Sequence, residues 1–262
     1  ATNNTITNNK IGVALDGTTG MGNTNGGVLI QSTSGVTVGG SAANESNIIA
    51  YNTGDAITVL SSGAKNNIVS RNVMYANTGL GIDLDQNDVT LNDAGDSDSG
   101  AGNDGLNFPQ FSQITLISGN LTVAGCAPAG ATIELFEADV SPTSGSGVSA
   151  GSNAFGMTQD YGEGEVFLTE WTMPASGTAC ALPADADGND STGMLACSQT
   201  FALSSLPAGA SIVLDDKLTA IATLAGTGTS EFSAIGLVAS FDYGDAPLSG
   251  TAPSGSGTNN YG

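Results

Sequence analysis

Two Asp-rich stretches are the residues best suited to chemistry in this sequence, and the chemistry they suit is the binding of a hard cation. The first, "NDAGDSDSGAGNDG", carries the carboxylates of Asp93, Asp96, Asp98 and Asp104. Asp-x-Asp spacing followed by Gly lets two carboxylates turn toward one ion while backbone carbonyls complete the shell. Crowding several carboxylates without a cation costs repulsion. The stretch predicts a calcium site, with a solvated Asp/Gly turn as the alternative.

A second stretch, "DADGND", offers Asp185, Asp187 and Asp190, with Asn189 as a neutral ligand. Neither stretch matches the full D-x-[DN]-x-[DN]-G-x₅-E calcium loop, because no bidentate Glu follows at the required place. Extracellular calcium sites fill even at about 10⁻⁴–10⁻³ M affinity. We therefore expect a second calcium site here, again with a plain turn as the alternative.

Catalytic side chains are scarce. The chain has no His, which excludes Ser-His-Asp and Cys-His arrangements. Arg71 is the only arginine and has no obvious basic partner for proton abstraction, so we interpret it as a surface residue. Asp83 and Asp85 in "GIDLDQND" lack the further residues that a glycosidase carboxylate cluster needs. The sequence predicts that the protein is not an enzyme.

The charge is strongly acidic, with 25 Asp and Glu against four Lys and Arg, a net charge of −21. Such a charge repels phosphate backbones and anionic lipid surfaces, so neither nucleic-acid binding nor membrane insertion is expected. No apolar run approaches the ~20 residues of a membrane helix. The composition is typical of a secreted or cell-surface protein, in which Cys180 and Cys197 could form a disulfide. Cys126 would then be buried, or bonded to something outside this sequence.

The elements that must position these residues are predicted to be strands. The chain is rich in Gly, Val, Ile, Thr, Ser and Asn, with 38 Gly and only 11% charged residues. This composition suits strands and turns, so we predict an all-β protein. Residues 1–111 carry a repeat, because Asn47 and Asn52 recur as Asn67 and Asn72. A period of about 20 residues with short alternating strands describes one coil of a parallel β-helix.

In such a helix each Asn is expected to tolerate left-handed turn geometry and to bond, through its side-chain amide, to the equivalent Asn of the next coil. The alternating apolar residues should face inward. The predicted inward positions are Ile6, Val28, Ile30, Val36, Val38, Ile48, Ile57, Val59, Ile68, Val73, Ile82 and Leu84.

Three phrases carry a resemblance to a known architecture: "GGVLIQSTSGVTVGGSAANESNIIAYNTGDAITV", "NTGLGIDL" and "NDAGDSDSGAGNDGLNFPQF". They resemble the closing coils of right-handed parallel β-helix repeats in large bacterial surface and secreted proteins. In those proteins a similar Asp/Gly segment ends the helix and leads into a β-sandwich. The resemblance implies a scaffold rather than a reaction.

Residues 112–240 read as an antiparallel, Ig-like β-sandwich, because short alternating runs such as "ATIELFEA" are separated by Gly, Pro, Ser and Asp. Residues 241–262 are predicted to be a linker or tail. We therefore expect a right-handed parallel β-helix over 1–111 followed by this sandwich.

The expected function is a non-catalytic extracellular structural or adhesive module that self-associates into a fibre or joins neighbouring surface-protein modules. An uncovered first coil would be the place for such contacts. The alternative is a carbohydrate-binding or carbohydrate-degrading β-helix module with a glycan as its partner. That alternative needs a row of aromatic side chains, and only Tyr51 and Tyr75 precede residue 108.

Overall fold

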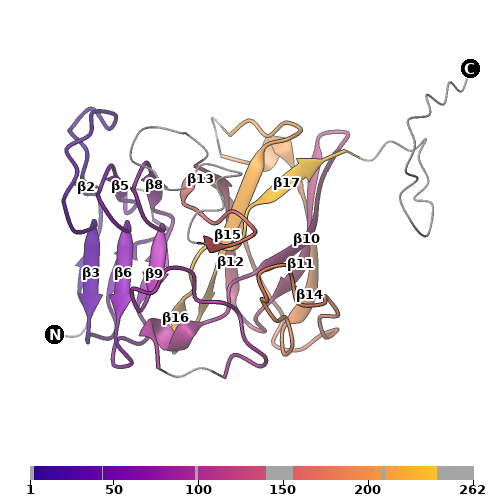
Figure 1. Cartoon of the computed structure of the whole chain (residues 1–262). Coiled ribbons are helices and arrows are strands. Elements are labelled where there is room, and N and C mark those ends of the chain that lie inside the picture. The colour runs from indigo at the N-terminus through magenta and orange to yellow at the C-terminus, as the bar shows by residue number, and fades with distance from the viewer. Residues whose placement is uncertain (1–2, 43, 98–99, 140–155, 208–209, 241–262) are drawn as a thin grey trace, which may run out of the picture.

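The structure is a computed structural model that describes residues 3–42, 44–97, 100–139, 156–207 and 210–240. The prediction of an all-β protein is confirmed, since apart from two 3₁₀ turns every described element is a strand (Figure 1). No described helix is long and apolar enough to cross a membrane. Asp98 and the predicted tail 241–262 lie outside the described residues.

Nine short strands in the first part of the chain form three parallel sheets. Their bounds are β1 Thr5–Ile6, β2 Lys10–Ile11, β3 Val28–Gln31, β4 Thr37–Gly39, β5 Ile48–Ala50, β6 Ile57–Leu60, β7 Ile68–Ser70, β8 Val73–Tyr75 and β9 Ile82–Leu84. The sheets have the orders β1-β4-β7, β2-β5-β8 and β3-β6-β9, so the chain passes through all three in turn, three times in total. Figure 1 shows β3, β6 and β9 side by side, with β2, β5 and β8 forming a second row.

The repeated Asn residues form ladders between successive layers, as predicted, but with a different spacing. The amide of Asn47 donates to the side-chain oxygen of Asn72, 25 residues further on, at 2.9 Å. Asn52 bonds Asn77 at the same separation and distance. The expected period of about 20 residues, which matched Asn47 with Asn67, is therefore wrong.

The left-handed residue at each of these corners precedes the ladder Asn. Tyr51 (φ 61°), Arg71 (φ 50°) and Ala76 (φ 54°) adopt positive φ, whereas Asn52, Asn72 and Asn77 do not. A left-handed residue turns the chain sharply, and the following Asn then points its side chain along the stack. The expectation that the repeated Asn itself takes the left-handed conformation is wrong at these corners.

The predicted inward positions are correct for some strands and displaced by one residue in others. Those that are buried are Ile30, Val36, Val38, Ile57, Val59, Ile82 and Leu84. In β5, β7 and β8 the central residues Ile49, Val69 and Met74 are buried, whereas the predicted Ile48, Ile68 and Val73 are only half-buried. These strands carry apolar residues on both faces, and alternation alone does not then fix which face is inside. Ile6 and Val28 are half-buried beside the same core.

The second part of the chain forms one curled, mixed eight-stranded sheet. Its strands are β10 Gln110–Ile117, β11 Asn120–Ala127, β12 Thr132–Ala138, β13 Gly164–Thr172, β14 Leu195–Ala202, β15 Lys217–Leu224, β16 Gly228–Thr229 and β17 Gly236–Ala239. The order is β13-β12-β15-β17-β10-β11-β14, with β16 beside β15. Strand β17 pairs antiparallel with β15 through Gly236 and Leu237, then parallel with β10 through Val238 and Ala239. One strand thus joins two antiparallel halves, and the expected purely antiparallel pairing is wrong at this strand.

The core of the stacked sheets continues into the curled sheet. Phe136 of β12, Ile221 of β15 and Phe232 belong to the same buried cluster as Ile57 and Ile82. The ring of Phe136 packs edge-on against those of Phe167 and Phe232, with centroids 5.6 and 5.5 Å away. A second core fills the curl of the eight-stranded sheet. The two parts therefore share apolar contacts and form a single packed junction.

Candidate functional site

The most unusual chemistry of the molecule lies at this junction, where four buried acidic residues meet the last layer of the parallel sheets. Glu134, Asp139, Glu163 and Glu231 are each at most 3% exposed. All four belong to the second part of the chain: Glu134 lies in β12, Asp139 follows it, Glu163 precedes β13 and Glu231 follows β16. Each accepts hydrogen bonds from the backbone of residues 70–90, as described below.

Glu163 ends one Asn ladder. The backbone N–H of Asn77 donates to Oε2 at 2.9 Å, and the Asn77 amide donates to Oε1. The carboxylate therefore occupies the place that a further Asn would take in the stack. Burial raises the pKa of Glu163 to about 8, although the two bonds from Asn77 act in the opposite direction. Glu163 is thus a ladder terminus whose charge state depends on pH near neutrality.

Glu134 and Arg71 join the corner between β7 and β8 to β12 and β13. Glu134 accepts from the Ser70 hydroxyl at 2.6 Å and from the Arg71 N–H at 2.8 Å. The Arg71 guanidinium pairs with Glu170 at 2.8 Å and lies 4.6 Å from the centroid of the Phe167 ring. The interpretation of Arg71 as a simple surface residue is wrong, because it bonds the two parts of the chain together.

Glu231 binds strand β9 and the segment that follows it. Its carboxylate accepts hydrogen bonds from the N–H groups of Leu84 at 2.8 Å and Thr90 at 2.9 Å. Burial raises its pKa well above the ordinary value. Asp139 accepts from the N–H of Ala76 at 2.7 Å. Open strand edges expose unpaired donors, and natural proteins cover them to prevent further pairing. These four carboxylates cover donors of the last layer.

The first predicted calcium loop is organised by its own hydrogen bonds. The Asp93 carboxylate accepts from the Ser97 N–H at 3.0 Å, and Asp96 accepts from the Asn107 N–H at 2.8 Å. Asp104 pairs with Lys65. Burial, together with the charges of Asp93 and Asp104, raises the pKa of Asp96. The three described carboxylates thus lie on one loop, each with a protein partner.

In the second loop the carboxylates hold the backbone as well. Asp185 accepts from the N–H groups of Asp187, Gly188 and Asn189, each at 3.0 Å. Asp187 accepts from the Gln159 N–H at 2.9 Å. Asp190 accepts from the Thr192 N–H at 2.7 Å. Within the described part of the chain, no three His, Cys, Asp or Glu side chains gather closely enough to hold a metal ion.

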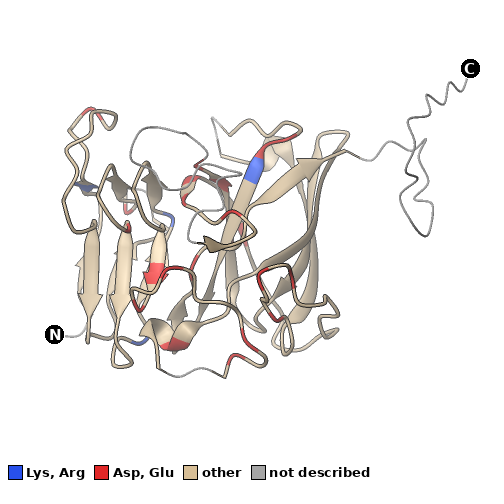
Figure 2. Cartoon of the chain, in the orientation of Figure 1, with Lys and Arg blue, Asp and Glu red and all other residues tan. Residues whose placement is uncertain are grey.

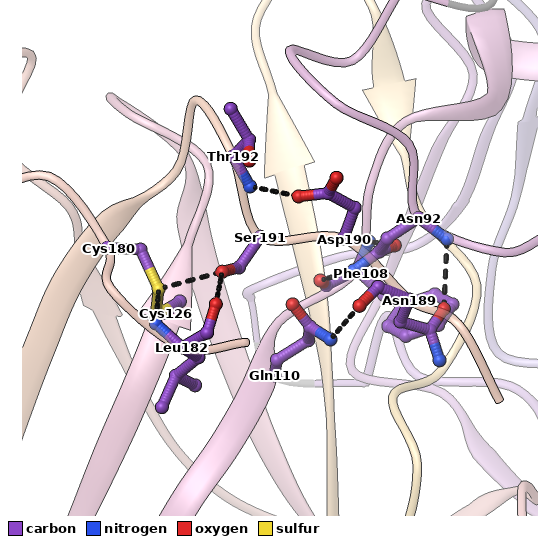
Figure 3. Close-up of a disulfide and its surroundings, with 10 residues drawn as sticks. All are labelled: Asn92, Phe108, Gln110, Cys126, Cys180, Leu182, Asn189, Asp190, Ser191 and Thr192. Atoms are coloured by element: carbon purple, nitrogen blue, oxygen red, sulfur yellow. Dashed lines mark hydrogen bonds between the residues drawn. A yellow bond between two sulfur atoms is a disulfide. The ribbon is translucent and has the colours of Figure 1, made fainter. Parts of the chain in front are cut away.

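The disulfide joins Cys126 to Cys180, so the expected pairing of Cys180 with Cys197 is wrong (Figure 3). Cys126 of β11 lies opposite Ala196 of β14, and Cys197 lies opposite Gly125. Neighbouring residues of a strand face opposite sides, so Cys197 points away from the face that carries Cys126. Cys197 contacts the core of the curled sheet, and burial raises the pKa of its thiol to about 11.

At the other end of the parallel sheets, the first layer is paired on one side only. Among the described strands, β1, β2 and β3 each have a single neighbour. A hollow of about 360 Å³ opens beside β1 and β3, lined by Ile6, Val28, Ile30 and Val36. These are residues of the internal core or its margin. This end, unlike the junction, thus shows apolar side chains and unpaired strand edges.

Sequence reasoning missed the junction carboxylates. Each sits in a strand-like phrase, "ATIELFEAD", "GEGEVFL" or "TSEFS", where acidic residues interrupt apolar or small residues. A charged residue at an inward strand position is a signal for a buried partner. The partner itself is far away in the sequence, since Asn77 and Glu163 are 86 residues apart. No model of a known protein family matches the chain.

Proposed function

We propose that this chain is a non-catalytic structural or adhesive module of an extracellular or cell-surface protein. The observation that carries the proposal is the use of the acidic side chains at the junction. Glu134, Glu163 and Glu231 are buried, and each bonds two donors of the last strand layer. Carboxylates engaged in these hydrogen bonds connect one part of the chain to the other and are not accessible as a base for a substrate.

In this proposal residues 1–111 form a right-handed parallel β-helix and residues 112–240 an Ig-like sandwich, with 241–262 as a linker or tail. The three parallel sheets visited in turn, and the Asn ladders between their layers, support the helix. The two antiparallel halves joined at β17 support a sandwich-like second domain. The disulfide between Cys126 and Cys180 supports an oxidising, extracellular location.

The first described layer, which is paired on one side only among the described strands, supports self-association or contact with a neighbouring surface-protein module. Strand edges and apolar side chains lie together at this end. A further layer of strands would satisfy the edges and cover Ile6, Val28 and Ile30. The junction end is already covered by carboxylates, so contacts between copies would involve the two first layers.

Calcium at the loop 93–104 remains part of the proposal. The raised pKa of Asp96, to which Asp93 and Asp104 contribute, means that a nearby cation would relieve repulsion there. A cation bound only by the folded protein stabilises it by mass action. We expect a chelator to lower the melting temperature, and Asp96→Asn to remove that sensitivity. Equal melting with and without calcium in the parent protein would contradict a site at this loop.

The non-catalytic role is tested by incubating the purified chain with pectin, alginate and neutral glycans and measuring product by reducing-end assay. We expect no turnover above a buffer control. Asp83 is the acidic residue to check, because burial and the charge of Asp55 raise its pKa to about 6, within the range a general acid uses. Product that disappears in the Asp83→Asn variant would overturn the proposal.

A further inference from the structure

A groove of about 410 Å³ lies on the outer face of β5 and β8 and shares one of the junction carboxylates, Asp139, in its lining. Ile48 and Val73 lie in register on this face. Tyr51 and Tyr75 stand beside them, with ring centroids 5.5 Å apart and planes nearly perpendicular. Glu165 of β13 and Asp139 complete the lining. The groove thus combines an aliphatic floor, two aromatic rings and two carboxylates.

The two tyrosines are fixed by the loop that precedes β3. The Tyr51 hydroxyl donates to the Thr18 carbonyl at 2.8 Å, and the Tyr75 hydroxyl donates to the Gly17 carbonyl. Gly20 packs directly on the Tyr51 ring, where a Cβ would lie 3.0 Å from Cγ. The rings are therefore held in place before any ligand arrives, which lowers the entropic cost of binding.

Donors in the groove are nearly all used. The N–H groups of Ile48, Tyr51 and Val73 bond to backbone carbonyls, and the N–H of Ala76 bonds to Asp139. Both tyrosine hydroxyls already donate a hydrogen bond to a backbone carbonyl of the loop that precedes β3. What the lining offers to a ligand is therefore mainly acceptor atoms, above all the carboxylate of Glu165. A ligand that carries donors and no acceptors matches this set.

None of the described basic side chains is part of the groove lining. Lys65 pairs with Asp104 and Arg71 with Glu170, both outside the groove lining. Lys10 pairs with Ile48 across the strands, and its ammonium donates to the Leu15 carbonyl at the margin of the groove, where a Cβ on Gly17 would lie 3.6 Å from it. Burial and the neighbouring carboxylates Asp139 and Glu137 raise the pKa of Glu165. A cation placed here would be attracted by Glu165, and contact with the face of a tyrosine ring would add to this attraction.

We propose that this groove binds a cationic side chain, lysine or arginine, presented by a partner protein. The alkyl stem would lie on Ile48 and Val73, as long basic side chains do on apolar surface. The charged group would reach Glu165 beside the Tyr75 ring. This adds a binding activity to the structural role and does not depend on it. Sugars are the weaker fit, because their hydroxyls also need donors that the lining lacks.

The test uses the full chain and four soluble probes: the N-acetyl methylamides of lysine, arginine and norleucine, and methyl α-glucoside. Binding is followed by the methyl signals of Ile48 and Val73 in ¹H–¹³C NMR spectra, with buried Ile114 as an internal reference. We expect the lysine and arginine probes to shift both signals with saturation. The norleucine probe, which has the same stem without the charge, and the glucoside should leave them unmoved.

Two variants, each of which removes one negative charge, test whether the lysine probe binds at Glu165. Glu165→Gln should lower the affinity for the lysine probe about fivefold. This corresponds to the loss of about 1 kcal/mol expected for a partly exposed ion pair. Asp88→Asn removes an exposed carboxylate outside the groove and should leave the affinity unchanged. Unshifted methyl signals, equal weakening in both variants, or equal binding of norleucine or glucoside would each overturn the proposal. Melting curves of both variants confirm that they are folded.

Discussion

Glu163 shows how one side chain can end a repeating pattern. In the ladder Asn23–Asn52–Asn77, each Asn oxygen accepts from the backbone N–H and the side-chain amide of the preceding Asn. An amide at the end of this row would present its own donor to the next layer. A carboxyl group accepts both bonds from Asn77, one on each oxygen, and has no amide with which to continue the row. The residue type thus stops the stack at the junction.

Buried carboxylates with raised pKa values make the stability depend on pH in a defined direction. The pKa of Glu163 rises from 4.5 to about 8 on folding. Its contribution to stability is therefore fully present below about pH 4.5 and is lost as the pH rises through 8. Glu231 shifts in the same direction. We expect the melting temperature to fall between pH 5 and pH 9 by at least about 2–4 °C, the effect of about 1 kcal/mol in a domain of 150–250 residues.

The Glu163→Gln variant isolates this residue. Because Gln does not ionise, the fall in melting temperature between pH 5 and pH 9 should become smaller. The Asp88→Asn variant, which changes an exposed carboxylate by the same charge, should keep the parent pH dependence. A parent melting temperature that rises over this interval would contradict the assigned direction of the shift.

At the scale of the strands, the face that a residue occupies decides its effect. Ile82 of β9 is fully buried among the stacked layers, whereas Ile48 of β5 lines the outer groove. An unpaired charge in the stack has no partner and costs several kcal/mol. We expect Ile82→Asp to abolish the cooperative melting transition, and Ile48→Asp, the matched control, to retain it. A chain that melts normally with Ile82→Asp would contradict the assigned strand packing.

The sequence predicts which strand residues face inward only where apolar and polar residues alternate within the strand itself. Strand β6 alternates cleanly and contains Thr58, so Ile57 and Val59 were correctly placed inside. Strand β5, "IIA", is apolar throughout, and its inward residue was displaced by one. The Asn repeat revealed the ladders, but connections of different length hid their spacing: Asn9 and Asn47 are 38 residues apart, and Asn47 and Asn72 are 25 apart.

Long-range features were beyond local patterns. The partners of Glu134 and Glu231 lie 63 or more residues away in the sequence, so no window of sequence joins them. The disulfide depended on the register of β11 with β14, which sets Cys126 and Cys197 on opposite faces. The parallel pairing of β17 with β10 required its switch between neighbours, which short strand-like runs do not reveal.

Across the whole molecule, charge and edge protection are unevenly distributed. Residues 1–44 contain one Lys and one Asp, so the net charge of −21 belongs entirely to the rest of the chain. In Figure 2 strands β3 and β6 carry no coloured segment, whereas acidic colour recurs along the loops of the second part. The first described layer is therefore locally neutral. Repulsion between copies would be least if they met through these ends, with their acidic parts far apart.

This arrangement predicts association through the first layer. Leu29 of β3 is 59% exposed at that end, and Leu237 of β17, at 57%, is a matched exposed residue of the curled sheet. Sedimentation velocity over a series of protein concentrations should show a dimer that grows with concentration and with added salt. Leu29→Asp should shift the population to monomer, because inward-facing or edge charges oppose strand pairing. Leu237→Asp should sediment like the parent protein. Two results would show that the first layer is not the contact: a parent protein that stays monomeric at every concentration, or an equal loss of dimer in both variants.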